Sequence, residues 1–215
     1  MDCFATLATT MRTLILLTAI TLPSCATTAE PRRAADSPSD WRVAATGHDR
    51  ERLRDWRDAF KTALDQARAA GHGADIEREG ELLQPDAAVG GVPIPNGNYR
   101  CRVIKVGAKT AGMLEYVSYP GFACRIRPER GIQGFAKLIG SQRPVGLIFR
   151  NDALRQVFLG TLVLGDETRA MQYGRDEERD IGAFVEKIGP NRWRMVMPYP
   201  AFESMIDIME LVPAS

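Results

Sequence analysis

The second half of the chain is a series of short hydrophobic or alternating runs, and this pattern constrains the fold more than any other feature. Nine runs follow one another at near-regular spacing, with turn residues between them and no long helical pattern: 99–106, 114–119, 122–127, 135–139, 145–149, 156–164, 184–188, 192–199 and 205–212. Short strands repeated in this way pair antiparallel in a barrel or a sandwich. A barrel is favoured because it leaves no strand edge exposed.

Helical periodicity precedes the strands. Hydrophobic residues recur at helical spacing from Leu53 to Ala67, with Thr46 placed to cap the N-terminus. A second, shorter helix is predicted over 74–83. The charged residues of the long helix, Arg52 among them, are expected on its solvated face. The expected fold is therefore mainly β in an α+β arrangement: an antiparallel β-barrel preceded by one long and one short helix.

Composition divides the chain into five segments. They are a signal peptide (1–25), a flexible tether of small and polar residues (26–39), a helical segment (40–84), a linker rich in Pro and Gly (85–98) and the β domain (99–215). Lys+Arg (28) and Asp+Glu (27) leave a formal net charge of +1. A chain so nearly neutral has no overall attraction to nucleic acid, and no nucleic-acid partner is expected.

The N-terminal segment has the order of features found in a secretory signal peptide. Arg12 precedes an apolar run (14–22) that is too short for a stable membrane anchor, and small residues follow. The residues before Met11 fit no targeting pattern, which indicates that translation starts at Met11. Leu22-Pro23-Ser24-Cys25 resembles the lipobox of bacterial lipoproteins, in which the cysteine is lipidated. The expectation is a protein on the periplasmic side of the envelope, anchored through Cys25; the alternative is a secreted protein cut nearby.

Two cysteines, Cys101 and Cys124, remain in the predicted folded region. In an oxidising compartment an isolated pair in a β-rich segment is most simply a disulfide, and its spacing matches no zinc or redox motif. Because successive side chains alternate across a strand, the pair would share the barrel interior with Tyr99, Val103 and Ile126.

The same alternation places four arginines on the opposite, outer face: Arg100, Arg102, Arg125 and Arg127. Guanidinium groups match phosphate in bidentate geometry, so this face is a candidate surface for an anionic lipid or glycan. The alternative is a solvated face neutralised by nearby acids.

No group of residues has the spacing that a particular chemistry requires. His48 and His72 flank the long helix and lie too far apart to share a site. Ser141 lies in no nucleophile elbow and has no histidine nearby in sequence. The acids between 166 and 180 alternate with arginines, which favours surface ion pairing over a cation site. No catalytic residue, metal ligand or cofactor is therefore predicted.

Several stretches share one resemblance: 97–107, 135–149, 158–167, 173–180 and 192–200, together with Asp40-Trp41 and the helix that contains Trp56. From about Asp40 to the C-terminus, they resemble a bacterial family, domain of unknown function 4893. The resemblance implies an envelope protein and transfers no catalytic residue. In addition, Gly97-Asn98-Tyr99 is similar to the opening of lipocalin-type barrels, which implies a calycin-like barrel.

Two functional hypotheses follow. The first is a non-catalytic accessory module that binds a small apolar molecule, a lipid or an envelope partner. The alternative is a hydrolase of unrecognised type that uses carboxylates or Ser141.

Overall fold

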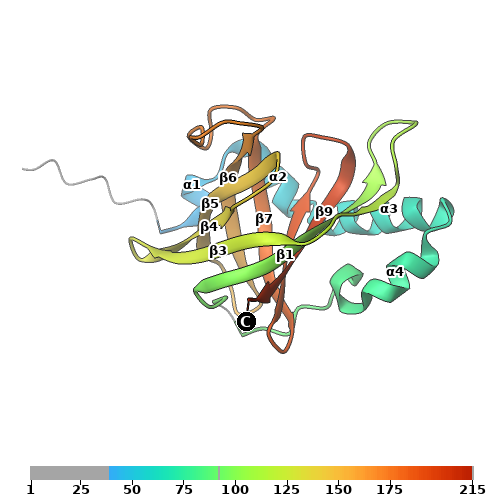
Figure 1. The fold of residues 1–215 in the computed structure, drawn as a ribbon, viewed down its shortest axis with the longest axis horizontal. Coiled ribbons are helices and arrows are strands. Elements are labelled where there is room, and N and C mark those ends of the chain that lie inside the picture. Colours follow the sequence, from blue (N-terminus) through green and yellow to red (C-terminus); the bar gives the residue numbers. More distant parts are fainter. Residues whose placement is uncertain (1–38, 92, 215) are drawn as a thin grey trace, which may run out of the picture. The chain divides into compact units, whose positions relative to one another are not determined.

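A closed sheet dominates the computed structural model, which describes residues 39–91 and 93–214. Nine antiparallel strands are ordered β2-β1-β3-β4-β5-β6-β7-β8-β9. Pairing of β1 with β9 closes eight strands into a barrel, and β2 is added beside β1 (Figure 1). The predicted antiparallel barrel is confirmed. The predicted signal peptide, Cys25 and nearly all of the predicted tether lie outside the described residues.

Each predicted run corresponds to one strand. The bounds are β1 (Gly97–Ala108), β2 (Tyr116–Ser118), β3 (Phe122–Glu129), β4 (Ile132–Lys137), β5 (Gln142–Arg150), β6 (Arg155–Leu164), β7 (Asp180–Gly189), β8 (Arg192–Pro198) and β9 (Ser204–Pro213). The largest difference is at β7, which begins at Asp180 rather than at 184. Asp180 and Gly182 have low strand propensity, so the pattern alone does not include them.

The helical segment differs from the prediction. It contains α1 (Trp41–Ala44), α2 (Gly47–Arg54), α3 (Trp56–Ala69), α4 (Gly73–Glu79) and a 3₁₀ turn, η1 (Gly80–Leu83). The predicted single long helix is wrong, because the chain bends at Asp55 between α2 and α3. The bend lets α2 pack on β7 while α3 packs on β1, β8 and β9. The predicted cap is present: the Asp49 N–H donates to Thr46 Oγ1 at 3.1 Å.

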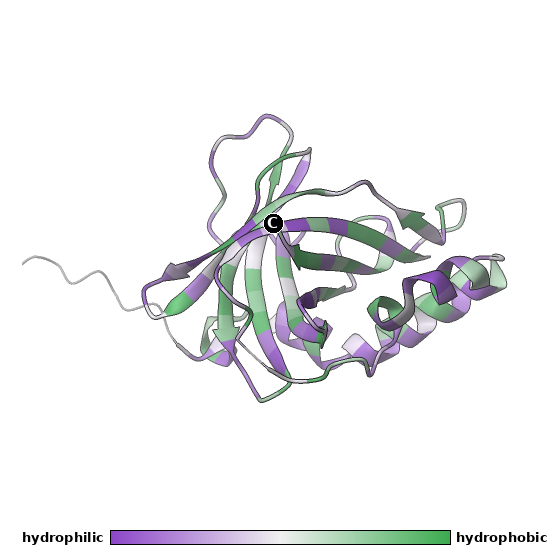
Figure 2. Ribbon diagram, turned by 60° about the horizontal axis from the view of Figure 1, so that its bottom comes forward, coloured by the Kyte–Doolittle hydropathy of each residue, from purple (hydrophilic) through white to green (hydrophobic). Residues whose placement is uncertain are grey.

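Hydrophobic cores lie on both sides of the barrel wall. The outer core joins the helices to the strands, with Phe60 and Leu64 of α3 packed among residues such as Ile104 and Ile206. The inner core fills the lower part of the barrel and includes Cys101 and Cys124 together with Tyr99 and Ile126, as predicted. In Figure 2 the helices alternate hydrophobic and hydrophilic residues, whereas long stretches of the strands are hydrophobic.

One end of the barrel is closed by the predicted linker. Ile94 is fully buried in the inner core. Its N–H donates to Gln156 Oε1 at 2.8 Å, and its carbonyl accepts from Gln133 Nε2 at 2.7 Å. The two glutamines therefore satisfy the hydrogen-bonding groups of the linker backbone where it crosses the barrel. This crossing leaves the opposite end as the possible entrance.

A close approach between β5 and β6 shapes the interior. Gly146 pairs with Gly160, and a Cβ atom on Gly160 would lie 2.4 Å from the Phe158 ring and from the Val145 carbonyl oxygen. Only glycine therefore fits at these positions without displacement. The space that they free is filled by Phe158, which packs edge-on against Phe135 with ring centroids 5.6 Å apart.

Candidate functional site

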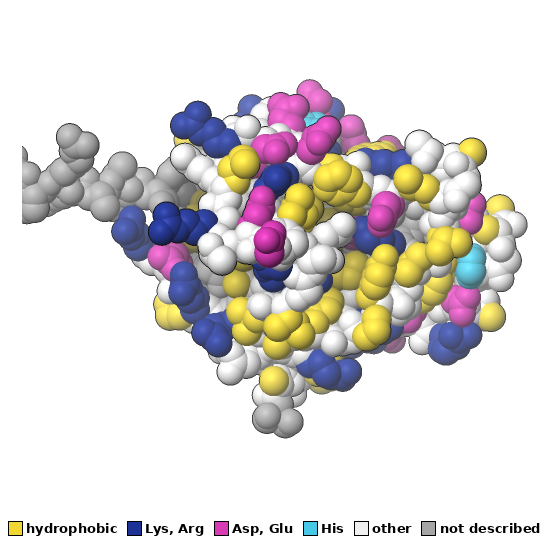
Figure 3. Space-filling model, turned by 45° about the horizontal axis from the view of Figure 1, so that its top comes forward, with side chains coloured by type: hydrophobic (Ala, Val, Ile, Leu, Met, Phe, Trp, Pro, Cys, Tyr) yellow, Lys and Arg dark blue, Asp and Glu magenta, His cyan; other side chains and the backbone are white. Residues whose placement is uncertain are grey.

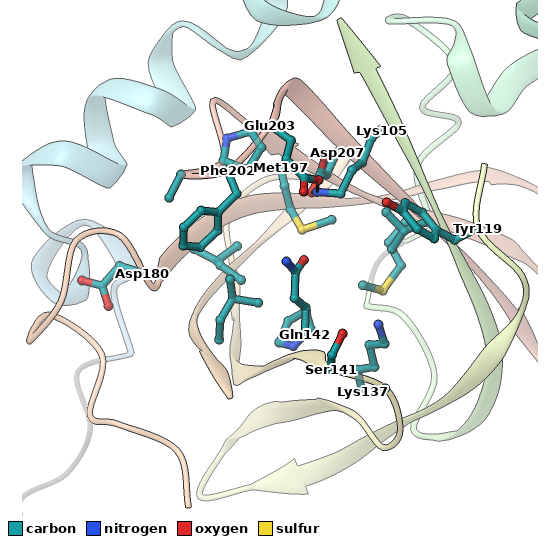
Figure 4. A pocket seen from close by; sticks show the side chains of 18 of the residues that line it. Lys105, Tyr119, Lys137, Ser141, Gln142, Asp180, Met197, Phe202, Glu203 and Asp207 are labelled. Carbon is teal, nitrogen blue, oxygen red and sulfur yellow. Dashed lines mark hydrogen bonds and ion pairs between the residues drawn. The ribbon is translucent and has the colours of Figure 1, made fainter. Parts of the chain in front are cut away.

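The open end of the barrel holds a cavity of about 500 Å³, between the loops that join the strand ends (Figure 4). Residues from all eight strands of the barrel and from the loops at this end line it. Three exposed hydrophobic residues on different loops stand at its rim: Tyr119, Ile139 and Phe202. Figure 3, in which the top of the barrel comes forward, shows hydrophobic side chains exposed among acidic and basic ones. The rim therefore offers an apolar entrance.

The inner wall of the cavity is largely apolar. It is formed by Val103, Phe122, Leu162, Ile181, Met197 and Met209. Alternation along the strands points these residues inward, as it does the inner-core residues further down. Methionine side chains are flexible and adapt to ligands of different shape. This part of the cavity can therefore accommodate apolar groups of different shape.

A charged cluster occupies one side of the cavity. Lys105 Nζ lies 3.1 Å from Asp207 Oδ2 and 3.4 Å from Glu203 Oε2, and Ser204 Oγ donates to Asp207. Burial lowers the pKa of Lys105, but the two carboxylates outweigh burial and the net pKa is raised. Lys105 is therefore a charged group that is already neutralised by its own neighbours.

The opposite side of the barrel contributes Lys137, Ser141 and Gln142 (Figure 4). The Lys137 ammonium lies 4.1 Å from the centroid of the Phe122 ring. Burial lowers the pKa of Lys137. Within residues 39–91 and 93–214, no carboxylate lies within 4.0 Å of this ammonium.

A buried network supports the wall near β7. Arg52, expected on a solvated face, is instead buried: it pairs with Asp49 and donates to the Asp180 carbonyl at 2.7 Å. Asp49 also accepts from Tyr173 Oη at 2.5 Å. The expectation fails because α2 turns this face onto β7. Burial raises the pKa of the Asp180 carboxyl, which accepts from the Gly174 N–H at 3.0 Å.

The structure brings Cys101 and Cys124 together on the inner face, below the cavity. Both are buried free thiols. Tyr99 pairs with Cys124 and Cys101 with Phe122, so the two cysteines are diagonal neighbours across β1 and β3. The disulfide stays a prediction.

The four predicted arginines share the outer face, but their environments differ. Arg102 pairs with Glu210 at 2.7 Å and with Glu79, so acids neutralise it. Arg127 lies 3.3 Å from Glu129. Arg125 Nε donates to Asn98 Oδ1 at 3.2 Å, and Arg100 is exposed. Acids therefore pair with Arg102 and Arg127, as the neutralised-face alternative expects, and anion binding by this face stays a prediction.

The residues considered for hydrolysis are dispersed. Ser141 lines the cavity, but its hydroxyl makes no hydrogen bond to a general base in the described part of the chain. His72 hydrogen-bonds Asp75 at 2.9 Å, and His48 lies on α2. The predicted ion pairing of the acidic segment is present, because Arg179 contacts Glu167 at 2.7 Å and Asp176 at 3.4 Å.

Lys105 and Lys137 were missed by the sequence reasoning, although a signal for them exists. Each lies two residues after an inward-facing residue of its strand, Val103 or Phe135. A lysine in that phase points into a barrel. The contribution of Phe202, by contrast, depends on the conformation of the loop between β8 and β9, which alternation does not describe.

The described residues contain neither a candidate metal cluster nor a helix suited to crossing a membrane. Among residues 39–91 and 93–214, no group of three or more His, Cys, Asp or Glu side chains is arranged to hold a metal ion. In the same part of the chain, no helix combines the length and apolar character needed to cross a bilayer.

Comparison with known proteins gives one match. No curated protein and no solved structure matches this chain. A family model described as a domain of unknown function (DUF4893) matches residues 41–211, from the first helix to the last strand. The match includes β1 to β8, β9 as far as residue 211, and the loops around the cavity. The chain therefore belongs to the DUF4893 family.

Proposed function

We propose that this protein is a non-catalytic binding module that holds a small apolar or amphipathic molecule in the open end of its barrel. The observation that carries the proposal is the cavity of about 500 Å³, a size typical of small-molecule sites. Its apolar inner wall belongs to a closed ring of strands, so little ordering is needed on binding. The exposed hydrophobic side chains at the rim are further evidence for a poorly soluble ligand.

Filling the cavity is expected to weaken ligand binding. Wild-type protein should bind the uncharged dye Nile red with enhanced fluorescence. Leu162→Trp places an indole in the cavity and should weaken binding by at least about tenfold, equivalent to 1.4 kcal/mol. Fluorescence titration measures the dissociation constants, and native mass spectrometry of the purified protein looks for a co-purifying ligand.

Leu114→Trp is the matched control, because Leu114 is strongly exposed and does not line the cavity. Ile181→Trp repeats the test from the next strand, β7, should Leu162→Trp lower stability. Dye binding by both cavity variants at wild-type affinity, or no binding by the wild type, would contradict the proposal.

The proposed location is the periplasmic side of the bacterial envelope, with a lipid anchor on Cys25. The support comes from the sequence: a signal-like segment, a lipobox-like Leu22-Pro23-Ser24-Cys25 and a tether of small and polar residues. Such an anchor would hold the barrel near a membrane that supplies apolar molecules. An oxidising compartment also makes a disulfide between Cys101 and Cys124 part of the proposal.

Metabolic labelling tests the anchor. Cells that express the full chain are grown with a labelled fatty acid, and the purified protein is expected to carry the label. Cys25→Ala should remove it, whereas Cys124→Ala should not, because Cys124 is buried in the barrel. An unlabelled wild type, or label that persists in Cys25→Ala, would show that the protein is not a lipoprotein.

A further inference from the structure

Among the residues that the structure describes, Lys137 is the cavity base that lacks a counter-ion. It is the last residue of β4, and Figure 4 shows its side chain at the open end of the cavity, near Ser141. The other two bases of the cavity are matched: Lys105 pairs with Asp207 and Glu203, and Arg52 pairs with Asp49. A partly buried cation without a partner costs free energy that an anionic ligand would recover.

The charges of the cavity are separated across the barrel. β4 carries Lys137, and the acids Glu203 and Asp207 lie at the start of β9, across the ring of strands. Figure 4 shows Lys137, Ser141 and Gln142 on one side and the acids with Lys105 on the other. Hydroxyl and amide groups donate hydrogen bonds to an anion. One side of the cavity therefore presents a cation together with hydrogen-bond donors.

The space beyond this site is apolar. Met197 and Met209 carry flexible thioethers, and Leu162 and Ile181 complete the wall. A head group held at Lys137 leaves its chain in contact with these residues. The geometry points to a ligand class: we propose that the cavity binds an amphipathic acid, with its carboxylate at Lys137 and its hydrocarbon chain against the methionines. This inference rests on the proposed function.

The test compares ligands that share a chain but differ in the head group. Isothermal titration calorimetry at neutral pH measures the binding of decanoate and of decanol to the full barrel. Wild-type protein should bind decanoate at least about tenfold more tightly than decanol. Lys137→Met should lose this preference and keep the wild-type affinity for decanol, which also shows that the variant is folded.

Lys61→Met is the matched control, because Lys61 is exposed on α3, outside the cavity. It should keep the preference for decanoate. A preference that persists in Lys137→Met, or equal binding of the two ligands by the wild type, would overturn the inference and leave the proposed function intact. Failure of the wild type to bind either ligand would instead overturn the proposed function.

Discussion

Replacing Arg194 by methionine is expected to lower the free energy of unfolding by about 3 kcal/mol, the usual effect of removing one partner of a buried ion pair. Arg194 is fully buried on the outer side of β8, where its guanidinium contacts Glu186 at 2.7 Å. The same group donates, at 2.6 to 3.1 Å, to the backbone carbonyls of Glu81, Leu82, Gln84 and Pro85.

This arrangement joins the helical segment to the barrel through one side chain. A planar guanidinium can serve a carboxylate and several carbonyls at once, because it presents five N–H donors in fixed directions. Methionine fills a similar volume but leaves those carbonyls without their donor and leaves Glu186 with Arg155 as its remaining partner. The segment from η1 into the linker would then lose its main polar attachment.

Arg192→Met is the matched control for this prediction. Arg192 lies on the same strand and the same side, and it pairs with Glu210 at 2.7 Å, but its side chain is 28% exposed. Water screens its ion pairs, so its loss should cost about 1 kcal/mol or less. Urea unfolding followed by tryptophan fluorescence gives both values. Equal losses for the two variants would show that Arg194 does not have this anchoring role.

The sequence predicts the barrel well because strand patterning is local. Inward and outward residues alternate on β1 and β3, and this alone places Tyr99, Cys101 and Ile126 in the interior. Closure of the barrel is not local, because it depends on β1 pairing with β9. A closed barrel is predicted only because exposed strand edges are unfavourable, and this argument does not identify the two strands that pair to close it.

The helical segment and the site are predicted less well, for a shared reason. Helical periodicity continues through Asp55, so the pattern contains no signal for the bend there. The bend follows from the curvature of the barrel on which α2 and α3 pack, and it also buries Arg52. Ion pairing of Arg102 likewise depends on Glu79, which reaches β1 through the packing of α4. Tertiary contacts of this kind leave no local pattern.

A disulfide between Cys101 and Cys124 is expected to stabilise the barrel by roughly 3 kcal/mol, because it restricts the unfolded chain. The two thiols are diagonal neighbours across β1 and β3, so little movement is needed to join them. Urea unfolding of the oxidised protein, with and without dithiothreitol, measures the difference. Cys101→Ala/Cys124→Ala should unfold at one urea concentration with or without the reductant.

The timing of oxidation provides a second test of the same bond. The thiolate is the form that reacts, and burial together with the neighbouring Cys124 raises the pKa of the Cys101 thiol. Folded, reduced protein should therefore oxidise slowly in a glutathione buffer, whereas the unfolded chain should oxidise readily. Under the proposed export, the bond would then form before the barrel closes, while the chain is still unfolded. Two titratable thiols in protein isolated from the periplasm, with an unfolding midpoint unaffected by reductant, would show that the bond does not form.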